Sequence, residues 1–331
     1  MTTRVPASPP QIAGFGHIRL LGSGGFADVY LFQQDMPYRQ VAVKVLHKTV
    51  NAADSADLAA MFRFEMDAMG RLGPHPAILT VHHAGISADG RPYLVMEHCP
   101  DGLGRSWRNS PLPASDVVHI GVKLASALET AHRAQVLHRD IKPSNVLFTE
   151  YGHPVLADFG ISGRLTGSGD SDVIAMSIPW SAPEVIRQET SGTVASEIWS
   201  LGATLYSLLA GRTPFQEVGE KKSPSTDKHK ERILRANYTP IGRADVPEEL
   251  ERVLLKTMWK DPTQRYESML ELAMELNRVQ GGMGDSLTPI ELPTNPWTQF
   301  DPVSSSARSS APPLAGGSVV PVESKRRRAQ S

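Results

Sequence analysis

Short apolar runs separated by glycines and polar turns fill the first third of the chain. Four such runs, at 18–21, 28–32, 40–45 and 91–97, each contain β-branched or aromatic residues among other apolar ones. Runs of this length, bounded by turn residues, are typical of β-strands. The pattern therefore predicts a sheet near the N-terminus.

Helical spacing replaces this pattern once in the first third of the chain and then in four stretches further on. Residues 56–72 bring Leu58, Phe62 and Met66 near one helical face, and helical spacing returns at 116–134, 194–210, 248–259 and 268–279. A sheet-rich piece followed by a helix-rich piece predicts two lobes with a cleft between them. Clefts of this kind are common ligand sites.

The two ends of the chain differ from this ordered part. Residues 1–12 form a polar, proline-rich lead, and residues 281–331 are rich in Pro, Ser and Gly. Such a composition cannot bury enough apolar surface to order itself, so we expect a disordered tail. The basic run at 325–328 is expected to be a solvated end, with an interaction or nucleic-acid patch as the alternative. The polar insert at 217–231 is expected to be an exposed loop.

The charge and cysteine content limit the classes of partner and the cellular compartment that we expect. Lys and Arg total 34 and Asp and Glu total 35, which gives a net charge of −1. This balance argues against nucleic acid or an anionic membrane as the main partner. With Cys99 as the single cysteine, no intramolecular disulfide can form, which favours a reducing compartment. No apolar stretch reaches the roughly 18 residues of a membrane span, so we expect a cytoplasmic protein.

Two motifs in the first third suggest a phosphate site. The glycine-rich segment 22–29 lies between two predicted strands, where its amide groups could approach phosphate oxygens, although a simple hairpin turn would give the same pattern. Lys44 lies inside an apolar strand, where an unpaired charge is costly. Glu65 could supply a carboxylate, while a solvated lysine and a surface glutamate are the alternatives.

Three further motifs carry a specific chemistry. His138-Arg139-Asp140 is followed by Asn145, then by 158–160 with the sequence Asp-Phe-Gly and by 182–184 with the sequence Ala-Pro-Glu. Together these motifs resemble the eukaryotic-type (Hanks-type) serine/threonine protein kinase family, including its bacterial members. The resemblance covers about residues 15–280. It implies an α+β bilobal fold with a β-rich N-lobe near 13–97 and a helical C-lobe near 100–280.

The resemblance also implies catalytic roles. Lys44 would bind the α- and β-phosphates of ATP and be held by Glu65. Asp140 would orient the substrate hydroxyl and accept its proton, and Lys142 would contact the γ-phosphate. Lysine at position 142 is typical of the serine/threonine branch. His138 is expected to be a packed structural residue.

The implied nucleotide and metal sites involve more residues. Asn145 and Asp158 would ligate Mg²⁺ through oxygen atoms, which suit that ion. The backbone of Glu97 and Cys99 would hydrogen-bond adenine. The other residues expected to contact the nucleotide are Leu21, Gly22, Ser23, Gly24, Gly25, Phe26, Val29, Ala42, Met96 and Leu147.

Some supporting positions depart from the family pattern. Ala27 replaces the third glycine, Glu197 replaces an aspartate that anchors the catalytic loop, and Met176-Ser177 replaces a Gly-Thr pair. One extra methylene at Glu197 could loosen the loop, whereas Ser177 keeps a hydroxyl for Asp140 and Lys142. Arg265 is expected to pair with Glu184 in the C-lobe.

These features predict a serine/threonine protein kinase that transfers the γ-phosphate of ATP to protein hydroxyls. Autophosphorylation at Thr166, Ser168 or Ser171, in trans within a transient homodimer, would order the activation loop against Arg139. The alternative for these hydroxyls is a mobile loop in which they are merely solvated. The alternative for the whole protein is a pseudokinase that binds nucleotide and acts as a scaffold.

Overall fold

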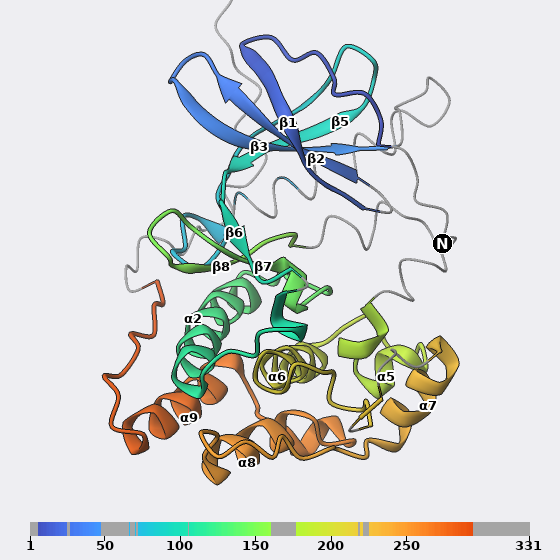
Figure 1. Cartoon of the computed structure of the whole chain (residues 1–331), viewed down its shortest axis with the longest axis vertical. Coiled ribbons are helices and arrows are strands. Elements are labelled where there is room, and N and C mark those ends of the chain that lie inside the picture. Colours follow the sequence, from blue (N-terminus) through green and yellow to red (C-terminus); the bar gives the residue numbers. More distant parts are fainter. Residues whose placement is uncertain are drawn as a thin grey trace, which may run out of the picture. The chain divides into compact units, whose positions relative to one another are not determined.

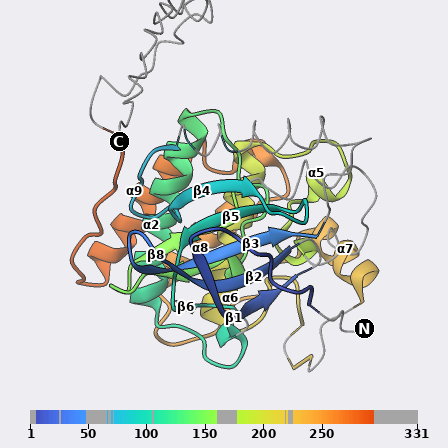
Figure 2. The same cartoon turned by 90° about the horizontal axis from the view of Figure 1, so that it is seen from above.

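The computed structural model describes residues 6–24, 27–47, 66, 70, 72–104, 106–159, 177–217, 219–220 and 225–293. Within this part, five antiparallel strands form one sheet in the order β1-β2-β3-β5-β4 (Figure 1; Figure 2 shows the same order from above). The strands are β1 (Phe15–Ser23), β2 (Ala27–Gln34), β3 (Arg39–Leu46), β4 (Val81–Ile86) and β5 (Pro92–Glu97).

The four predicted strand runs lie within or overlap β1, β2, β3 and β5. Strand β4 was not predicted. Its sequence contains two histidines and a glycine, and all of its residues are exposed or half-buried at the sheet edge. An edge strand of this composition lacks the alternation of apolar and polar residues that identifies a half-buried strand.

Each face of this sheet carries an apolar cluster, and the position of a residue along its strand decides which cluster its side chain joins. Neighbouring residues of a strand point to opposite faces. Ala42 and Leu46 therefore join a cluster that also contains Ala157 from the other lobe. Val41 and Val43 join a separate cluster on the opposite face. Because Lys44 shares its face with Ala42 and Leu46, its side chain points towards the C-lobe.

The C-lobe consists mainly of helices arranged around α6 (Figure 1). The longer helices are α2 (Ala114–Arg133), α6 (Val194–Ala210), α7 (Thr226–Arg235), α8 (Glu248–Thr257) and α9 (Met269–Gly282). The shorter elements are β6 (Asp101–Gly102), η1 (Ser106–Arg108), η2 (Pro143–Asn145), β7 (Val146–Phe148), β8 (Pro154–Leu156), η3 (Ile178–Trp180), α5 (Pro183–Ile186) and η4 (Pro262–Gln264). Strands β6, β7 and β8 form a small second sheet.

The four helices predicted for this lobe correspond to α2, α6, α8 and α9, while most of the helix predicted at 56–72 lies outside the described residues. The insert at 217–231 was expected to be a loop, but helix α7 begins at Thr226. Its sequence is strongly polar, and buried His229 and Ile233 attach it to the lobe. Two buried positions give too weak a period for a helix to be predicted.

Helix α6 is the centre of this lobe. Its first turn is held by a capping box between Thr193 and Ser196. Gly202 lies where α6 crosses α8, and a Cβ atom there would approach Thr257 Oγ1 to 1.8 Å. Only glycine permits this close packing. Within the described residues, no helix combines the length and apolar character needed to cross a membrane.

The folded chain continues past Gly281, where we expected the tail to begin, as far as Leu292. Ser126 Oγ on α2 donates to the carbonyl of Glu291 at 2.5 Å and accepts from its amide at 2.7 Å. Lys123 Nζ also lies 2.7 Å from Glu291 Oε1. Backbone and side-chain polar contacts of this kind leave no hydrophobic period in the sequence, which explains why the composition suggested a tail.

Candidate active site

Lys44 and Asp158 meet between the two lobes. The Nζ atom of Lys44 donates to Asp158 Oδ1 at 2.8 Å, and only 11% of the lysine side chain is exposed. The alternation along β3 directs Lys44 into this position. The expected partner Glu65 lies outside the described residues, so its contact with Lys44 stays a prediction.

The surroundings of Asp158 keep it ionised. Burial alone would raise the pKa of Asp158, but the charge of Lys44 and its hydrogen bond hold that pKa below the ordinary value. Asp158 also has a left-handed backbone, with φ of 66°. Few residues other than glycine adopt this conformation, and outliers of this kind cluster at functional sites.

The segment that follows α2 carries two expected catalytic side chains, Asp140 and Lys142, and Ser177 meets them from further along the chain. Asp140 Oδ2 lies 2.7 Å from Lys142 Nζ, and Asp140 Oδ1 accepts from Ser177 Oγ at 2.7 Å. Lys142 Nζ also donates to Ser177 Oγ at 3.1 Å. The hydroxyl of Ser177 therefore bridges the carboxylate and the ammonium group, as we expected from the sequence.

Asn145 belongs to the same constellation. Its Nδ2 atom donates to the carbonyl of Asp140 at 2.7 Å and to Asp140 Oδ2 at 3.1 Å. These bonds fix the orientation of the amide. Its Oδ1 atom accepts no hydrogen bond from the residues that the structure describes.

Asn145 Oδ1 and the second carboxylate oxygen of Asp158 form a hard oxygen donor set that fits Mg²⁺. Across the described ranges, no cluster of three or more His, Cys, Asp or Glu residues could hold a metal ion by protein ligands alone. Magnesium is usually held by one or two protein oxygens together with substrate phosphates. The donor set is therefore consistent with an ion that binds together with a nucleotide.

Glu197 supports the catalytic loop from α6. Its carboxylate accepts from the backbone N–H of Arg139 at 2.6 Å and lies 2.6 Å from His132 Nε2. Arg139 has a left-handed backbone with φ of 66°. The extra methylene of Glu197 therefore does not prevent contact with the loop. His132 was missed from the sequence because its contact joins two helices that are far apart along the chain.

His138 is a structural residue, as we expected. Its ring is fully buried and packs on Phe159, with ring centroids 4.5 Å apart. Its Nδ1 accepts from the backbone N–H of Asp140 at 3.2 Å, and its Nε2 lies 2.9 Å from the carbonyl of Ala157. Burial lowers the pKa of His138, which keeps the ring neutral.

The expected walls of the nucleotide site lie in one hydrophobic cluster. This cluster contains Ala42 and Met96, with the partly buried side chains of Leu21, Val29, Cys99 and Leu147 packed against it. Burial raises the pKa of the Cys99 thiol to about 12, so it stays protonated near neutral pH.

The polar part of the same site is only partly described. Gly22, Ser23 and Gly24 lead into the tip of the β1–β2 hairpin, and Gly25 and Phe26 lie outside the described residues. At the segment between the lobes, the backbone N–H of Glu97 is already engaged, because it donates to the carbonyl of Thr80 at 2.9 Å.

A buried ion pair joins Glu184 to Arg265. Arg265 donates from Nη1 and Nη2 to the two carboxylate oxygens at 2.7 and 3.0 Å. Its guanidinium group also donates to the carbonyls of Ala195 and Trp259 and lies over the ring of Trp199. The pair expected from the sequence is therefore formed, and its remaining hydrogen bonds are satisfied.

Comparison with known proteins agrees with this geometry. The sequence profile described as "Protein kinase domain" matches residues 15–276. The chain is 38% identical over 298 residues to serine/threonine-protein kinase PknK of Mycobacterium tuberculosis, covering 87% of this chain and 26% of the relative. It is 32% identical over 266 residues to serine/threonine-protein kinase PrkC of Bacillus subtilis, covering 78% of this chain and 39% of the relative.

The chain thus spans about a quarter of the length of PknK and less than half of PrkC. The profile nevertheless covers most of the chain, including both lobes and every motif identified above. The family and the bilobal fold expected from the sequence are confirmed. The chain belongs to the protein kinase domain family.

Proposed function

We propose that this protein is a serine/threonine protein kinase that transfers the γ-phosphate of ATP to hydroxyl groups of proteins. The observation that carries the proposal is the meeting of Asp140, Lys142 and Ser177 within 3.1 Å of one another. The Lys44–Asp158 pair supplies the second half of the site. The names of the bacterial relatives support the same activity.

In this proposal, each group has one task in an in-line transfer. Lys44 holds the α- and β-phosphates, and Lys142 faces the γ-phosphate. Asp140 orients the acceptor hydroxyl and takes its proton while the hydroxyl oxygen bonds to the γ-phosphorus. The bond from that phosphorus to the bridging oxygen breaks, and ADP leaves. Catalysis of this kind rests mainly on positioning and charge stabilisation.

Asn145 and Asp158 are proposed to hold Mg²⁺, which supplies positive charge to the phosphate oxygens. Asp158 is suited to this task because the charge of Lys44 keeps its carboxyl ionised. The apolar cluster around Ala42 and Met96 excludes water from the adenine side. Water exclusion strengthens the electrostatic interactions in the site.

Regulation by the activation loop is a further part of the proposal. Arg139 is exposed beside Asp140 and could receive a phosphate from the loop. The candidate positions Thr166, Ser168 and Ser171 lie outside the described residues. Their modification, the transient homodimer and the cytoplasmic location stay predictions.

Radiolabelled phosphate transfer from ATP to a mixed protein acceptor tests the proposal, with Asp140→Asn as the matched control. We expect phosphoserine and phosphothreonine, and no phosphotyrosine, from the wild-type protein alone. Transfer that is equally weak in both proteins would favour the pseudokinase alternative. Phosphotyrosine as the main product would refute the serine/threonine assignment.

A further inference from the structure

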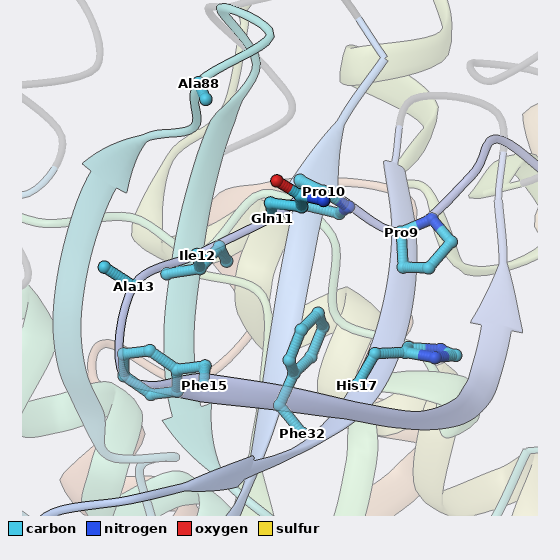
Figure 3. A pocket seen from close by; sticks show the side chains of 9 residues that line it. All are labelled: Pro9, Pro10, Gln11, Ile12, Ala13, Phe15, His17, Phe32 and Ala88. Atoms are coloured by element: carbon cyan, nitrogen blue, oxygen red, sulfur yellow. The ribbon is translucent and has the colours of Figure 1, made fainter.

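The N-terminal lead was expected to lie outside the folded domain, but residues 6–12 are attached to the sheet. We call this segment the N-terminal strap. Figure 3 shows Pro9, Pro10 and Ile12 beside the aromatic side chains of Phe15 and Phe32, around a pocket. The strap therefore covers the face of the sheet that is turned away from the expected nucleotide site.

Hydrogen bonds to the side chains of Asp28, Tyr30 and Arg91 hold the strap. The backbone N–H of Ala7 donates to Asp28 Oδ2 at 3.1 Å, and the hydroxyl of Tyr30 donates to the carbonyl of Ala7. Arg91 Nη2 donates to the carbonyl of Ser8 at 2.8 Å. These three bonds involve the strap backbone, and Ile12 adds an apolar contact as a member of the buried cluster on this face of the sheet.

Asp28 connects the strap to the glycine-rich segment. Its side chain is almost completely buried, with 1% exposed. Oδ1 accepts from Ser23 Oγ at 2.5 Å, while Oδ2 faces Ala7 and lies 3.1 Å from His47 Nε2. A buried carboxylate needs such partners, because an unpaired buried charge is costly.

The ionisation of Asp28 agrees with this arrangement. Burial would raise the pKa of Asp28, but the hydrogen bonds from Ser23 and Ala7 and the neighbouring His47 ring hold it below the ordinary value. The carboxylate is therefore charged at neutral pH, and each donor that is removed weakens its environment.

Asp28 also closes the base of the glycine-rich hairpin. Ser23 and Asp28 are direct cross-strand partners in the β1–β2 register, and the backbone N–H of Gly24 donates to the carbonyl of Ala27 at 2.9 Å. Alternation along β2 places Asp28 on the strap side, whereas its neighbour Val29 faces the cleft. Asp28 can therefore act on the loop without touching a nucleotide.

We propose that Asp28 is a positioning residue through which the N-terminal strap pre-orders the base of the glycine-rich loop, residues 22–24 and 27–29, for nucleotide binding. The inference rests on the proposed function, because it assumes that residues 22–29 cover ATP. Glycines make such a loop costly to order, and order present before binding reduces that cost. Loss of the strap contact is therefore expected to weaken nucleotide binding more than it slows transfer.

The cleanest perturbation is Ala7→Pro, which removes the N–H that donates to Asp28 and leaves the sheet itself unchanged. Ser8→Ala is the matched control, because Ser8 is bonded through its carbonyl. Asp28→Asn is the second variant and weakens the same contact between the strap and the sheet by removing the charge of the acceptor. If about half of the free energy of one hydrogen bond to a charged group is transmitted to the loop, KM for ATP and Kd for Mg-ADP increase by about three- to tenfold. The kcat is expected to stay within about twofold.

Hydrogen–deuterium exchange of the free protein gives a readout that needs no activity. Amides of residues 22–29 should exchange faster in Ala7→Pro and Asp28→Asn than in Ser8→Ala. Unchanged exchange and unchanged KM in Ala7→Pro would overturn the inference. A lower melting temperature with unchanged KM would also overturn it, since the contact would then be structural only.

Failure of the proposed function gives a different result. If the wild-type protein binds Mg-ADP but transfers no phosphate, the proposed activity fails, while Kd and the exchange rates still decide the role of the strap. If it binds no nucleotide, the proposed function fails, and faster exchange at 22–29 in Ala7→Pro still supports the coupling of strap and loop.

Discussion

Replacing Glu197 by alanine is expected to slow phosphate transfer without removing any group that contacts a substrate. Glu197 is 2% exposed and makes two contacts of 2.6 Å, to the backbone N–H of Arg139 and to His132 Nε2. The first contact holds a left-handed residue next to Asp140. Such a backbone conformation costs about 1–2 kcal/mol for a residue other than glycine.

The magnitude follows from the lost bonds. Hydrogen bonds to a charged group contribute about 1.5–3 kcal/mol each. Since water can enter the space left by Glu197→Ala, we expect the free energy of unfolding to fall by about 3 kcal/mol rather than by the full sum. If about half of this loss appears as displacement of Asp140, kcat falls by about tenfold, because 1.4 kcal/mol corresponds to one factor of ten.

The assay compares kcat, KM for ATP and urea unfolding in the wild-type protein, Glu197→Ala and Glu197→Gln. Glutamine keeps the size of the side chain and an acceptor oxygen for the N–H of Arg139, so its kcat should stay within about threefold of the wild-type value. KM for ATP should change little in either variant, because Glu197 lies outside the hydrophobic cluster around Ala42 and Met96 that is expected to line the nucleotide site.

Two results would refute this reasoning. A kcat unchanged in Glu197→Ala, despite lower stability, would show that the catalytic loop keeps its geometry without this anchor. An equal loss in Glu197→Gln and Glu197→Ala would show that the charge matters rather than the hydrogen bond to Arg139.

Two further predictions concern other parts of the C-lobe. Arg265→Ala leaves the buried carboxylate of Glu184 unpaired and should lower the free energy of unfolding by about 3–5 kcal/mol in urea denaturation; a loss below about 1 kcal/mol would contradict the assigned role of the pair. Ser177→Ala removes the hydroxyl between Asp140 and Lys142 and should lower kcat about tenfold with KM for ATP unchanged. Ser177→Thr keeps the hydroxyl and serves as the control, so an equal loss in both variants would argue against the bridge.

The sequence predicted the elements whose signals are local. Strand β3 is a short apolar run and helix α6 is a long one, and their bounds were predicted to within one residue. The motifs around Asp140 and Asp158 likewise predicted most of the site, because each motif is a continuous segment of the chain. The contact between Lys44 and Asp158 was not predicted, since the two residues are 114 positions apart.

The sequence was least informative where backbone hydrogen bonds and single polar side chains attach a segment. The N-terminal strap depends on Asp28, and the chain beyond α9 depends on Ser126. Both segments were expected to be unattached, because neither has a hydrophobic period. A buried carboxylate or hydroxyl leaves no trace in a hydrophobic pattern, although its position inside an apolar strand or helix is a signal that can be sought.

The central claim is that the chain transfers phosphate by using Asp140 as the group that receives the hydroxyl proton. The most direct test measures Mg-ATP affinity and phosphate transfer on the same preparations of wild-type protein and Asp140→Asn. The account predicts that affinity stays within about threefold while transfer falls by at least about 100-fold, the scale of general base catalysis. Transfer that persists in Asp140→Asn at the wild-type rate would contradict the account.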